Sequence, residues 1–322
     1  MDVKSFIKAA RLRTLPLSVS GIIVGTLLGV SQFNNTDSQN ISDDLGTTFQ
    51  VNHIDVETSI TLFILAILTT IGFQVLSNFA NDYGDGIKGS DKNRTGEARM
   101  VSSGAITPKQ MKNAMVVTTI ITLIIALLLI YFSFGKENFL YSILFFVLGI
   151  ASIVAAIKYT VGNSAYGYSG FGDIFVFLFF GLLSVVGSYF LFTKAINFEI
   201  FLPAISIGLL STAVLNLNNL RDRDEDKINN KNTLVVKLGI ANAKNYHYVL
   251  ILGALIAALS HTYLNFESYY QLLYLVAFIP LILNITTVSK NTIPAELDGE
   301  LKKVALSTFL FALIFGITNF IF

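Results

Sequence analysis

The 322-residue sequence contains no cysteine and no tryptophan, and only 13% of its residues are charged. Without cysteine, the chain can form neither disulfides nor thiolate metal sites. Soluble domains usually carry about 25% charged residues. The low charge, 53% hydrophobic residues and a mean hydropathy of +0.65 together exclude an ordinary water-soluble protein. The net charge of +1 indicates no particular partner, and no nucleic-acid partner is expected.

The sequence does contain many long apolar stretches rich in Leu, Ile, Val and Phe. A spanning helix needs about 20 mostly apolar residues, whereas the strands of a membrane barrel would alternate apolar and polar residues. The stretches therefore predict an all-α membrane protein with a single domain over 1–322. The predicted transmembrane helices cover residues 14–32, 59–80, 112–134, 139–157, 172–193, 199–219, 243–263, 268–289 and 303–322.

The positive charges are divided unevenly between the predicted loops. If the N-terminus is cytoplasmic and the chain alternates sides, all of the 22 Lys and Arg except Lys136 and Lys194 lie on the cytoplasmic side. Cytoplasmic loops are enriched in Lys and Arg. The N-terminus and the loops 81–112 and 220–244 are therefore predicted to be cytoplasmic and the C-terminus external, with the acidic segment 33–57 as an external loop.

A first polar cluster, NFANDYGDGIKGSD, follows the second predicted helix. Its residues Asn78, Asp82 and Asp85 are spaced so that they share one face of a helix. The three glycines of the cluster are predicted to break the helix there and to let Asp91 fold back toward that face.

A second polar cluster, NLNNLRDRDEDKINNKNT, follows the sixth predicted helix. Here Asn218, Asp222 and Asp226 share one helical face, while Asp224 and Glu225 are predicted to point into solvent. The two clusters lie on the same side of the membrane, each with Asn before Asp at a helix end.

Two groups of carboxylates on facing helices suit Mg²⁺, which binds one or two carboxylates together with the phosphate oxygens of a substrate. A diphosphate bridging two such ions would be neutralised and would become a good leaving group. Nearby cations available for the remaining phosphate oxygens are Lys88, Arg94, Arg99, Arg221 and Lys227. The alternative interpretation is that these are solvated loop charges, and that Asn78, Asn81, Asn218 and Asn219 only form hydrogen bonds between helices.

A third segment, KYTVGNSAYGYSGFGDIFVFLFFG, starts at a helix end on the same side. Tyr159, Tyr166 and Tyr168 offer aromatic walls with hydroxyl groups for a planar acceptor, unless they are only an interfacial tyrosine belt. Asp173 enters an apolar run, where a charge is costly and usually functional. Arg11, in the N-terminal ARLRTLPLSV, fits a simple positive anchor at the membrane surface.

The two acidic motifs, Asn81-Asp82-Tyr83-Gly84-Asp85 and the DRDED that spans Asp222–Asp226, resemble those of the UbiA superfamily of membrane prenyltransferases. Within it, the chain is most similar to the 1,4-dihydroxy-2-naphthoate polyprenyltransferase branch. The narrower resemblance is carried by the four stretches ARLRTLPLSV, NDYGDGIKGSD, YTVGNSAYGYSGFGD and NNLRDRDEDKINNKNTLVVKLG. One departure is TGEARM, where many relatives have Gly-Pro before the Arg.

The resemblance implies a bundle of nine helices around a central cavity, in a bacterial cell membrane, with lateral access for a lipid tail. It also implies loss of diphosphate from a polyprenyl diphosphate, assisted by Mg²⁺ in the form of two bridging ions. In this branch the ring of 1,4-dihydroxy-2-naphthoate attacks the allylic cation, the ring carboxylate leaves as CO2, and a demethylmenaquinone results.

The resemblance and the helical spacing together predict the site residues. The predicted metal ligands are Asn81, Asp82, Asp85, Asp222 and Asp226. Asp173 is predicted to act with the four aspartates of that set in catalysis. The predicted substrate-binding residues are Asn78, Asn81, Lys88, Asp91, Arg94, Arg99, Lys158, Tyr159, Tyr166, Tyr168, Asn218, Asn219 and Arg221.

Three alternatives remain open from the sequence. The nearest is a related prenyltransferase with another aromatic acceptor, such as 4-hydroxybenzoate. A secondary transporter would also place polar groups on broken helices, but usually near the bilayer midplane and often in inverted repeats. A head-group phosphotransferase would use an aspartate-rich metal site with a different motif.

Overall fold

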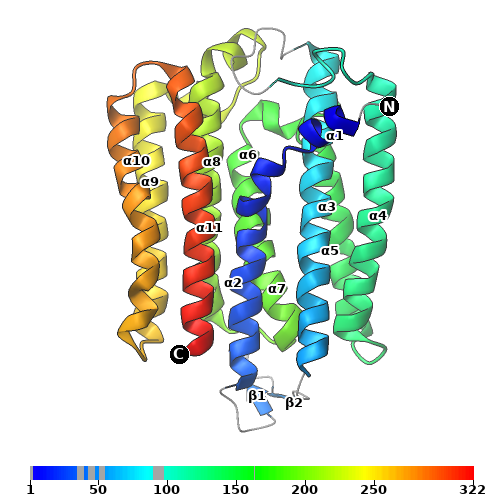
Figure 1. Cartoon of the computed structure of the whole chain (residues 1–322), viewed down its shortest axis with the longest axis vertical. Coiled ribbons are helices and arrows are strands. Elements are labelled where there is room, and N and C mark those ends of the chain that lie inside the picture. Colours follow the sequence, from blue (N-terminus) through cyan, green and yellow to red (C-terminus); the bar gives the residue numbers. More distant parts are fainter. Residues whose placement is uncertain (1–2, 35–39, 43–47, 51–54, 90–97, 163) are drawn as a thin grey trace.

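The chain forms a bundle of long helices that run side by side (Figure 1). In this computed structural model, nine segments of the described residues are long and apolar enough to cross a membrane, which confirms the predicted multi-pass all-α architecture. The N- and C-termini lie at opposite ends of the bundle (Figure 1). The structure describes residues 3–34, 40–42, 48–50, 55–89, 98–162 and 164–322.

The elements follow the predicted helices closely but are generally longer. The α-helices are α1 (Val3–Ala10), α2 (Leu15–Asn34), α3 (Val56–Lys88), α4 (Pro108–Phe134), α5 (Phe139–Lys158), α6 (Gly172–Val176), α7 (Ser184–Thr193), α8 (Phe201–Ile228), α9 (Leu234–Leu264), α10 (Leu275–Lys290) and α11 (Leu297–Ile321). Shorter 3-10 turns are η1 (Leu12–Thr14), η2 (Tyr166–Ser169), η4 (Phe198–Ile200), η5 (Tyr269–Tyr274) and η6 (Pro294–Glu296), and η3 (Phe177–Leu183) is a π-helical segment between α6 and α7. We call the end of the bundle at α1 the N-terminal face and the end where α11 stops the C-terminal face.

Two short strands interrupt the otherwise helical chain between α2 and α3. Strands β1 (Asn40–Ser42) and β2 (Thr48–Gln50) pair antiparallel. They lie at the C-terminal face (Figure 1), inside the segment that the sequence predicted only as a loop.

Local sequence explains where several helices begin. Asp55 caps α3, because its carboxylate accepts the Thr58 N–H at 2.7 Å. Thr107 and Gln110 form a capping box at the start of α4, with Pro108 in the first turn. These caps satisfy backbone N–H groups that a helix start leaves without partners.

The helix α3 corrects one prediction about glycine. Gly84 and Gly86 do not break it, and it continues to Lys88 before Gly89 turns the chain at a φ of 71°. Inside the helix, these glycines allow close packing instead: a Cβ on Gly84 would lie 2.7 Å from Thr160 Oγ1, and one on Gly86 would lie 2.6 Å from Val101 Cγ1. The first acidic cluster is therefore carried on a regular helix.

Close packing of small residues also joins α2 to α7. Gly21, Gly25 and Gly29 are spaced four residues apart, and a Cβ on Gly25 would lie 2.1 Å from the Val185 carbonyl oxygen. Small residues at this spacing let membrane helices approach closely. The contact holds α7, and with it the π-helical segment η3 before it, against α2.

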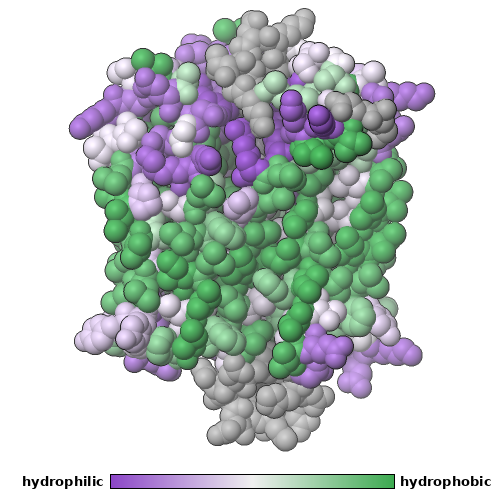
Figure 2. Space-filling view, in the orientation of Figure 1, coloured by the Kyte–Doolittle hydropathy of each residue, from purple (hydrophilic) through white to green (hydrophobic). Residues whose placement is uncertain are grey.

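The outer surface is apolar between two polar ends. Figure 2 shows a hydrophobic band across the middle of the visible side of the molecule, with hydrophilic residues gathered at its two ends. Helices α4 and α5 contribute many exposed Val, Ile, Leu and Phe side chains to it. A band of this kind matches the hydrocarbon core of a bilayer, so the chain is a multi-pass membrane protein.

Candidate active site

A cavity of about 370 Å³ lies inside the bundle. Its walls near the N-terminal face are polar and include Arg11, Asn78, Asn81, Asp85, Arg99, Asn218 and Lys231. Farther along the helices its walls are apolar and include Ile22, Ala66, Leu129, Phe145, Phe179, Leu183 and Leu191. The cavity therefore has a charged mouth and a hydrophobic interior.

Asp85 on α3 is the acidic residue at this mouth that most directly lines the cavity. It is 3% exposed. Its Oδ1 accepts a hydrogen bond from the Tyr168 hydroxyl at 2.8 Å, and Arg99 Nη2 lies 3.4 Å from its Oδ2. These two partners fix the carboxylate in a single orientation at the cavity wall.

Asn81, one turn earlier on α3, also lines the cavity. Its Oδ1 accepts from the Thr160 hydroxyl at 3.2 Å, and the same hydroxyl donates to the Ala80 carbonyl at 3.0 Å. Thr160 follows α5, so this contact joins the third segment, which starts at Lys158, to the first acidic cluster on α3. Thr160 was not among the predicted site residues.

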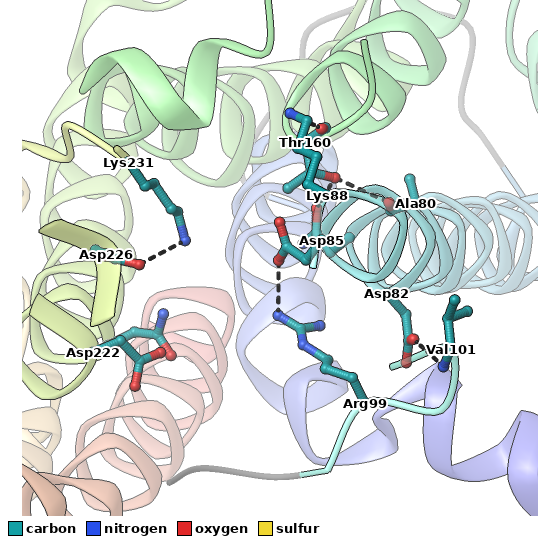
Figure 3. Close-up of polar contacts among 12 residues, drawn as sticks. Ala80, Asp82, Asp85, Lys88, Arg99, Val101, Thr160, Asp222, Asp226 and Lys231 are labelled. Atoms are coloured by element: carbon teal, nitrogen blue, oxygen red, sulfur yellow. Dashed lines mark hydrogen bonds and ion pairs between the residues drawn. The ribbon is translucent and has the colours of Figure 1, made fainter. Parts of the chain in front are cut away.

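The sequence predicts that Asp82 faces the metal site, but in the structure its side chain turns to the backbone of the following loop. Its two carboxylate oxygens accept the backbone N–H groups of Met100 at 2.9 Å and Val101 at 2.8 Å. Figure 3 shows it directed toward Val101 and away from Asp85. At about 100° per residue, Asp82 and Asp85 point about 60° apart on the helix, which is enough to send one to the loop and the other to the cavity. Asp82 thus anchors the segment that carries Arg99.

Asn78 has a positioning role as well as a place in the cavity wall. Its amide donates to the Ala10 carbonyl at 2.8 Å and to Thr14 Oγ1 at 3.1 Å. Between these two acceptors, Arg11 adopts a left-handed backbone with a φ of 49°. The turn brings Arg11 to the cavity, a role that the sequence did not distinguish from membrane anchoring.

The second acidic cluster lies on α8, across the cavity mouth from Asp85. Figure 3 shows Asp222 and Asp226 on one side of the gap and Asp85 on the other. Asp222 and Asp226 are each 6% exposed. Asp224 is exposed, as predicted, and Glu225 is half-buried. The two clusters that the helical spacing predicted are therefore brought together by α3 and α8.

Asp226 is paired with a cation that the sequence analysis did not select. Lys231 Nζ lies 3.2 Å from Asp226 Oδ1, and Lys231 lines the cavity. The chain returns because Asn230 adopts a φ of 55° and Lys231 N–H donates to the Asp226 carbonyl. Lys227, which we expected to bind phosphate, is exposed instead.

The donors at the mouth fit a hard divalent cation. Within the described part of the chain, Asp226 Oδ2 is buried and has no hydrogen-bond partner. Asn81, Asp85, Asp222 and Asp226 offer only oxygen ligands, which Mg²⁺ prefers. No three His, Asp or Glu among the described residues lie close enough to hold an ion alone. The arrangement suits ions that complete their coordination with substrate phosphate oxygens and water.

Two predicted phosphate-binding cations have other partners. Arg221 donates to both oxygens of Asp222 at 2.6 and 2.8 Å and to Asp298 at 2.5 Å. It also donates to Asn218 Oδ1 at 2.8 Å. Lys88 donates to the Thr160 carbonyl at 2.8 Å and lies 3.9 Å from the centre of the Tyr168 ring. In this structure both residues orient other parts of the site.

The third segment forms one wall of the cavity through Tyr159 and Tyr166. Their rings meet edge to face at 5.3 Å, and the Tyr166 ring stacks on Phe175 at 3.9 Å. The Tyr166 hydroxyl donates to the Ala155 carbonyl at 2.9 Å. Burial raises the pKa of the Tyr159 hydroxyl, and the nearby charge of Asp173 raises it further. Tyr159 and Tyr166 therefore form an aromatic wall, and burial keeps both hydroxyls protonated.

The cavity wall does not include Asp173, Lys158 or Asn219, nor does it include Asp82, Lys88, Tyr168, Arg221, Asp222 and Asp226. Asp173 is buried at the start of α6 and hydrogen-bonded to Tyr246 of α9. Its Oδ1 has no partner within the residues that the structure covers. Lys158 is exposed and Asn219 is buried inside α8, and neither lines the cavity. Asp91 and Arg94 lie outside the described residues.

Comparison with known proteins identifies relatives over nearly the whole chain. The sequence profile of the UbiA prenyltransferase family matches residues 53–298. The 1,4-dihydroxy-2-naphthoate octaprenyltransferase of Escherichia coli is 37% identical over 319 residues, which cover 99% of this chain and 96% of that protein. The protein of the same name from Haemophilus influenzae is 38% identical over 320 residues, 98% of this chain and 95% of its own length.

Solved structures share the fold at low sequence identity. The apo structure of a UbiA homolog from Aeropyrum pernix K1 has a TM-score of 0.67 at 14% identity and covers 96% of this chain and 98% of its own. A UbiA homolog from Archaeoglobus fulgidus, bound to GPP and Mg²⁺, has a TM-score of 0.61 at 14% identity, with coverage of 99% and 100%. The helical membrane bundle is therefore the same in these proteins.

Proposed function

Since the chain belongs to the UbiA prenyltransferase family, we propose that it transfers a polyprenyl group from a polyprenyl diphosphate to 1,4-dihydroxy-2-naphthoate. Because the members of this family are prenyltransferases, the chain is a prenyltransferase and not a transporter or a phosphotransferase. The observation that carries the proposal is the cavity with Asp85 at a charged mouth and an apolar interior behind it. A polyprenyl diphosphate has the same division into a charged head and an apolar tail.

The diphosphate binds at the mouth, between the clusters of α3 and α8. Asn81 and Asp85 on one side and Asp222 and Asp226 on the other would hold two Mg²⁺ ions. When bound, Mg²⁺ neutralises the diphosphate oxygens and makes the diphosphate a better leaving group. Arg99, Arg11 and Lys231 line the same mouth and supply further positive charge for the departing diphosphate.

The apolar interior receives the prenyl tail. Its Phe, Leu and Ile side chains, among them Phe145 and Phe179, exclude water from the allylic carbon. A dry site matters because water would capture an allylic cation before the ring could react. Tyr159 and Tyr166 line the cavity, and aromatic rings stabilise a nearby cation.

The acceptor ring lies against the tyrosine wall at the boundary between the polar mouth and the interior. The C–O bond to the diphosphate breaks, and the diphosphate keeps the electron pair. A ring carbon forms the new C–C bond and loses its proton, and the ring carboxylate departs as CO2 and is replaced by a proton. No electrons leave the ring, so the immediate product is the reduced form of a demethylmenaquinone. Asp173, which is buried at the start of α6 and hydrogen-bonded to Tyr246, is proposed to take part in binding or deprotonating the acceptor.

The N-terminal face, which carries both acidic clusters, is proposed to be cytoplasmic. All Lys and Arg of the chain except Lys136 and Lys194 belong to segments on this side, as the positive-inside rule requires. The C-terminus then lies outside. This orientation places the charged mouth where a soluble dihydroxynaphthoate can reach it.

The proposal is tested with purified protein, a labelled polyprenyl diphosphate, Mg²⁺, and either 1,4-dihydroxy-2-naphthoate or 4-hydroxybenzoate. We expect labelled lipid product from the naphthoate only, with one CO2 released per product. Product from 4-hydroxybenzoate alone would overturn the acceptor assignment, and no product from either would overturn the proposed reaction. Asp85→Asn is expected to abolish turnover, whereas Asp224→Asn, at a side chain that is 75% exposed, serves as the matched control.

A further inference from the structure

A second cavity, of about 100 Å³, opens on the C-terminal face. It lies between the ends of α2, α9 and α11 and the turns η4 and η5, far along the helices from Asp85 and Asp226. Its walls include Glu199, His261, Glu267, Gln271 and Asn319. The polar lining is unusual for a bundle whose middle is apolar, and prenyl transfer at the opposite face does not use it.

The charge of this cavity selects a cation. Glu199 and Glu267 both line it, and none of the described lining residues is Lys or Arg. Apart from His261, the other polar side chains of the wall are uncharged hydroxyls and amides: Ser31, Gln32, Tyr189, Asn197, Asn265, Gln271 and Asn319. A bare metal ion is a poor fit, because no three His, Asp or Glu in the described ranges converge closely enough to hold one.

His261 provides an independent sign that the cavity has an occupant. It is only 5% exposed, it lines the cavity, and its Nδ1 has no hydrogen-bond partner within the described chain. Its ring packs against Phe315 with centroids 5.2 Å apart, so it cannot turn freely to find another partner. A buried ring nitrogen without a partner costs free energy unless a ligand satisfies it.

The rim of the cavity is held in place by Gln271. Its Oε1 accepts the backbone N–H groups of Glu267 at 2.8 Å and Ser268 at 3.1 Å. Its amide donates to the Asn265 carbonyl at 3.0 Å and to Asn319 Oδ1 at 3.3 Å. The side chain thus ties the α9–η5 turn to α11, and the cavity is formed before any ligand arrives.

Aromatic residues around the cavity indicate its depth in the membrane. Tyr263, Tyr269 and Tyr270 are 83%, 82% and 62% exposed. All three belong to the end of α9 and to η5, which form the cavity rim. Exposed tyrosines gather where the hydrocarbon core meets the lipid head groups. The opening therefore lies at the level of the head groups.

We propose that this cavity binds the primary ammonium group of a phospholipid, such as the head of phosphatidylethanolamine. The group carries three N–H donors, and the cavity wall offers the Glu199 and Glu267 carboxylates and the His261 ring nitrogen as acceptors for them. Hydrogen bonds from a charged donor are stronger than neutral ones. The site tethers a lipid at the C-terminal face and does not depend on the acceptor or the metal of the catalytic cavity.

The test measures lipid binding to the purified full chain by native mass spectrometry. Phosphatidylethanolamine, phosphatidylglycerol, phosphatidylcholine and free ethanolamine are added separately to wild type, Glu199→Gln, Glu267→Gln and Glu137→Gln. Glu137 is an exposed glutamate in the α4–α5 turn on the same face, outside the cavity, and serves as the matched control. We expect selective binding of phosphatidylethanolamine, and a loss of about tenfold or more in Glu199→Gln and Glu267→Gln.

Binding that is unchanged in both cavity variants, or equal for all three lipids, would overturn the proposal. Binding of free ethanolamine as tight as that of the lipid would overturn the lipid source and leave a site for soluble amines. Prenyl transfer is measured on the same samples and is expected to be equal in wild type and Glu199→Gln. A protein that binds the lipid but transfers no prenyl group would overturn the proposed reaction and leave this site standing.

Discussion

The hydroxyl of Tyr168 donates a 2.8 Å hydrogen bond to Asp85, although the two residues are 83 positions apart in the chain. The contact joins the turn η2 to helix α3. The backbone carbonyl of Tyr168 also accepts the Asn232 N–H at 3.0 Å, next to the segment that carries Lys231. One tyrosine thus connects the two acidic clusters on opposite sides of the cavity mouth.

Tyr168→Phe removes this hydroxyl and keeps the ring beneath Lys88. A hydrogen bond to a charged group contributes about 1.5–3 kcal/mol, so we expect kcat/KM for the prenyl diphosphate to fall by about tenfold or more. Steady-state kinetics at saturating acceptor measures the effect. Tyr131→Phe is the control, because Tyr131 is 61% exposed on α4 and remote from the mouth. Equal loss in both variants would contradict the role of Tyr168.

We expect substitutions of Asp82 and of Asp85 to affect the protein in different ways. Asp82 holds the backbone of Met100 and Val101, so Asp82→Ala leaves two buried N–H groups without partners, at a cost of about 1–3 kcal/mol each. We expect a lower Tm together with a partial loss of activity. Asp85→Asn keeps the Tm near that of wild type and abolishes turnover. Thermal melts and product assays on both proteins separate the two roles. An Asp82→Ala protein with wild-type Tm and no activity would restore Asp82 as a metal ligand.

This pair also shows how far the sequence predicts the site. The nine predicted transmembrane helices follow from apolar length alone, and the two acidic clusters follow from their spacing and from their place at helix ends. The direction of the Asp82 side chain does not follow from the sequence. Its partners lie 18 and 19 residues farther along the chain, and helical spacing describes only neighbours on one helix. Arg11 and Lys231 were missed for a related reason. Each reaches the mouth through a residue with positive φ, Arg11 itself and Asn230, and no periodic pattern records such a turn.

Lys231 is expected to bind the diphosphate, since it lines the mouth and its Nζ lies 3.2 Å from Asp226. Lys231→Met keeps much of the side-chain volume and removes the charge. We expect kcat/KM for the prenyl diphosphate to fall by about tenfold or more, as for other lost charged contacts. The rate should therefore fall more at low than at saturating concentrations of this substrate. Lys227→Met provides the control, because Lys227 is exposed on the same short segment. If both variants lose activity equally, the effect is one of general surface charge.

We expect the Tyr159 hydroxyl to stay neutral during turnover and to make the stability of the folded protein depend on pH. Burial raises the pKa of its hydroxyl above the usual value of 10 in the folded protein. The unfolded chain therefore releases this proton first, so the stability from Tyr159 is complete below about pH 10 and is lost as pH rises above that value. Tyr159→Phe should flatten the decline of Tm between about pH 10 and 11 and leave the pH profile of activity near neutrality unchanged. A shifted activity profile near neutral pH would show that Tyr159 ionises during turnover.

Mg²⁺ and diphosphate are expected to stabilise the protein together through Asp226. Its Oδ2 is buried without a partner in the described chain, and its neighbours Asp222 and Asp85 add negative charge at the same mouth. A ligand that binds only the folded protein raises stability by about 2.7 kcal/mol at a hundredfold excess over its Kd. We expect Mg²⁺ with inorganic diphosphate to raise the Tm of wild type, EDTA to reverse the rise, and either component alone to give less. In Asp226→Asn the rise should nearly disappear, because the substitution removes a negative charge and a neutral amide binds Mg²⁺ more weakly than a carboxylate does. The same melts on Asp224→Asn should match wild type, and a full rise in Asp226→Asn would place the metal site elsewhere.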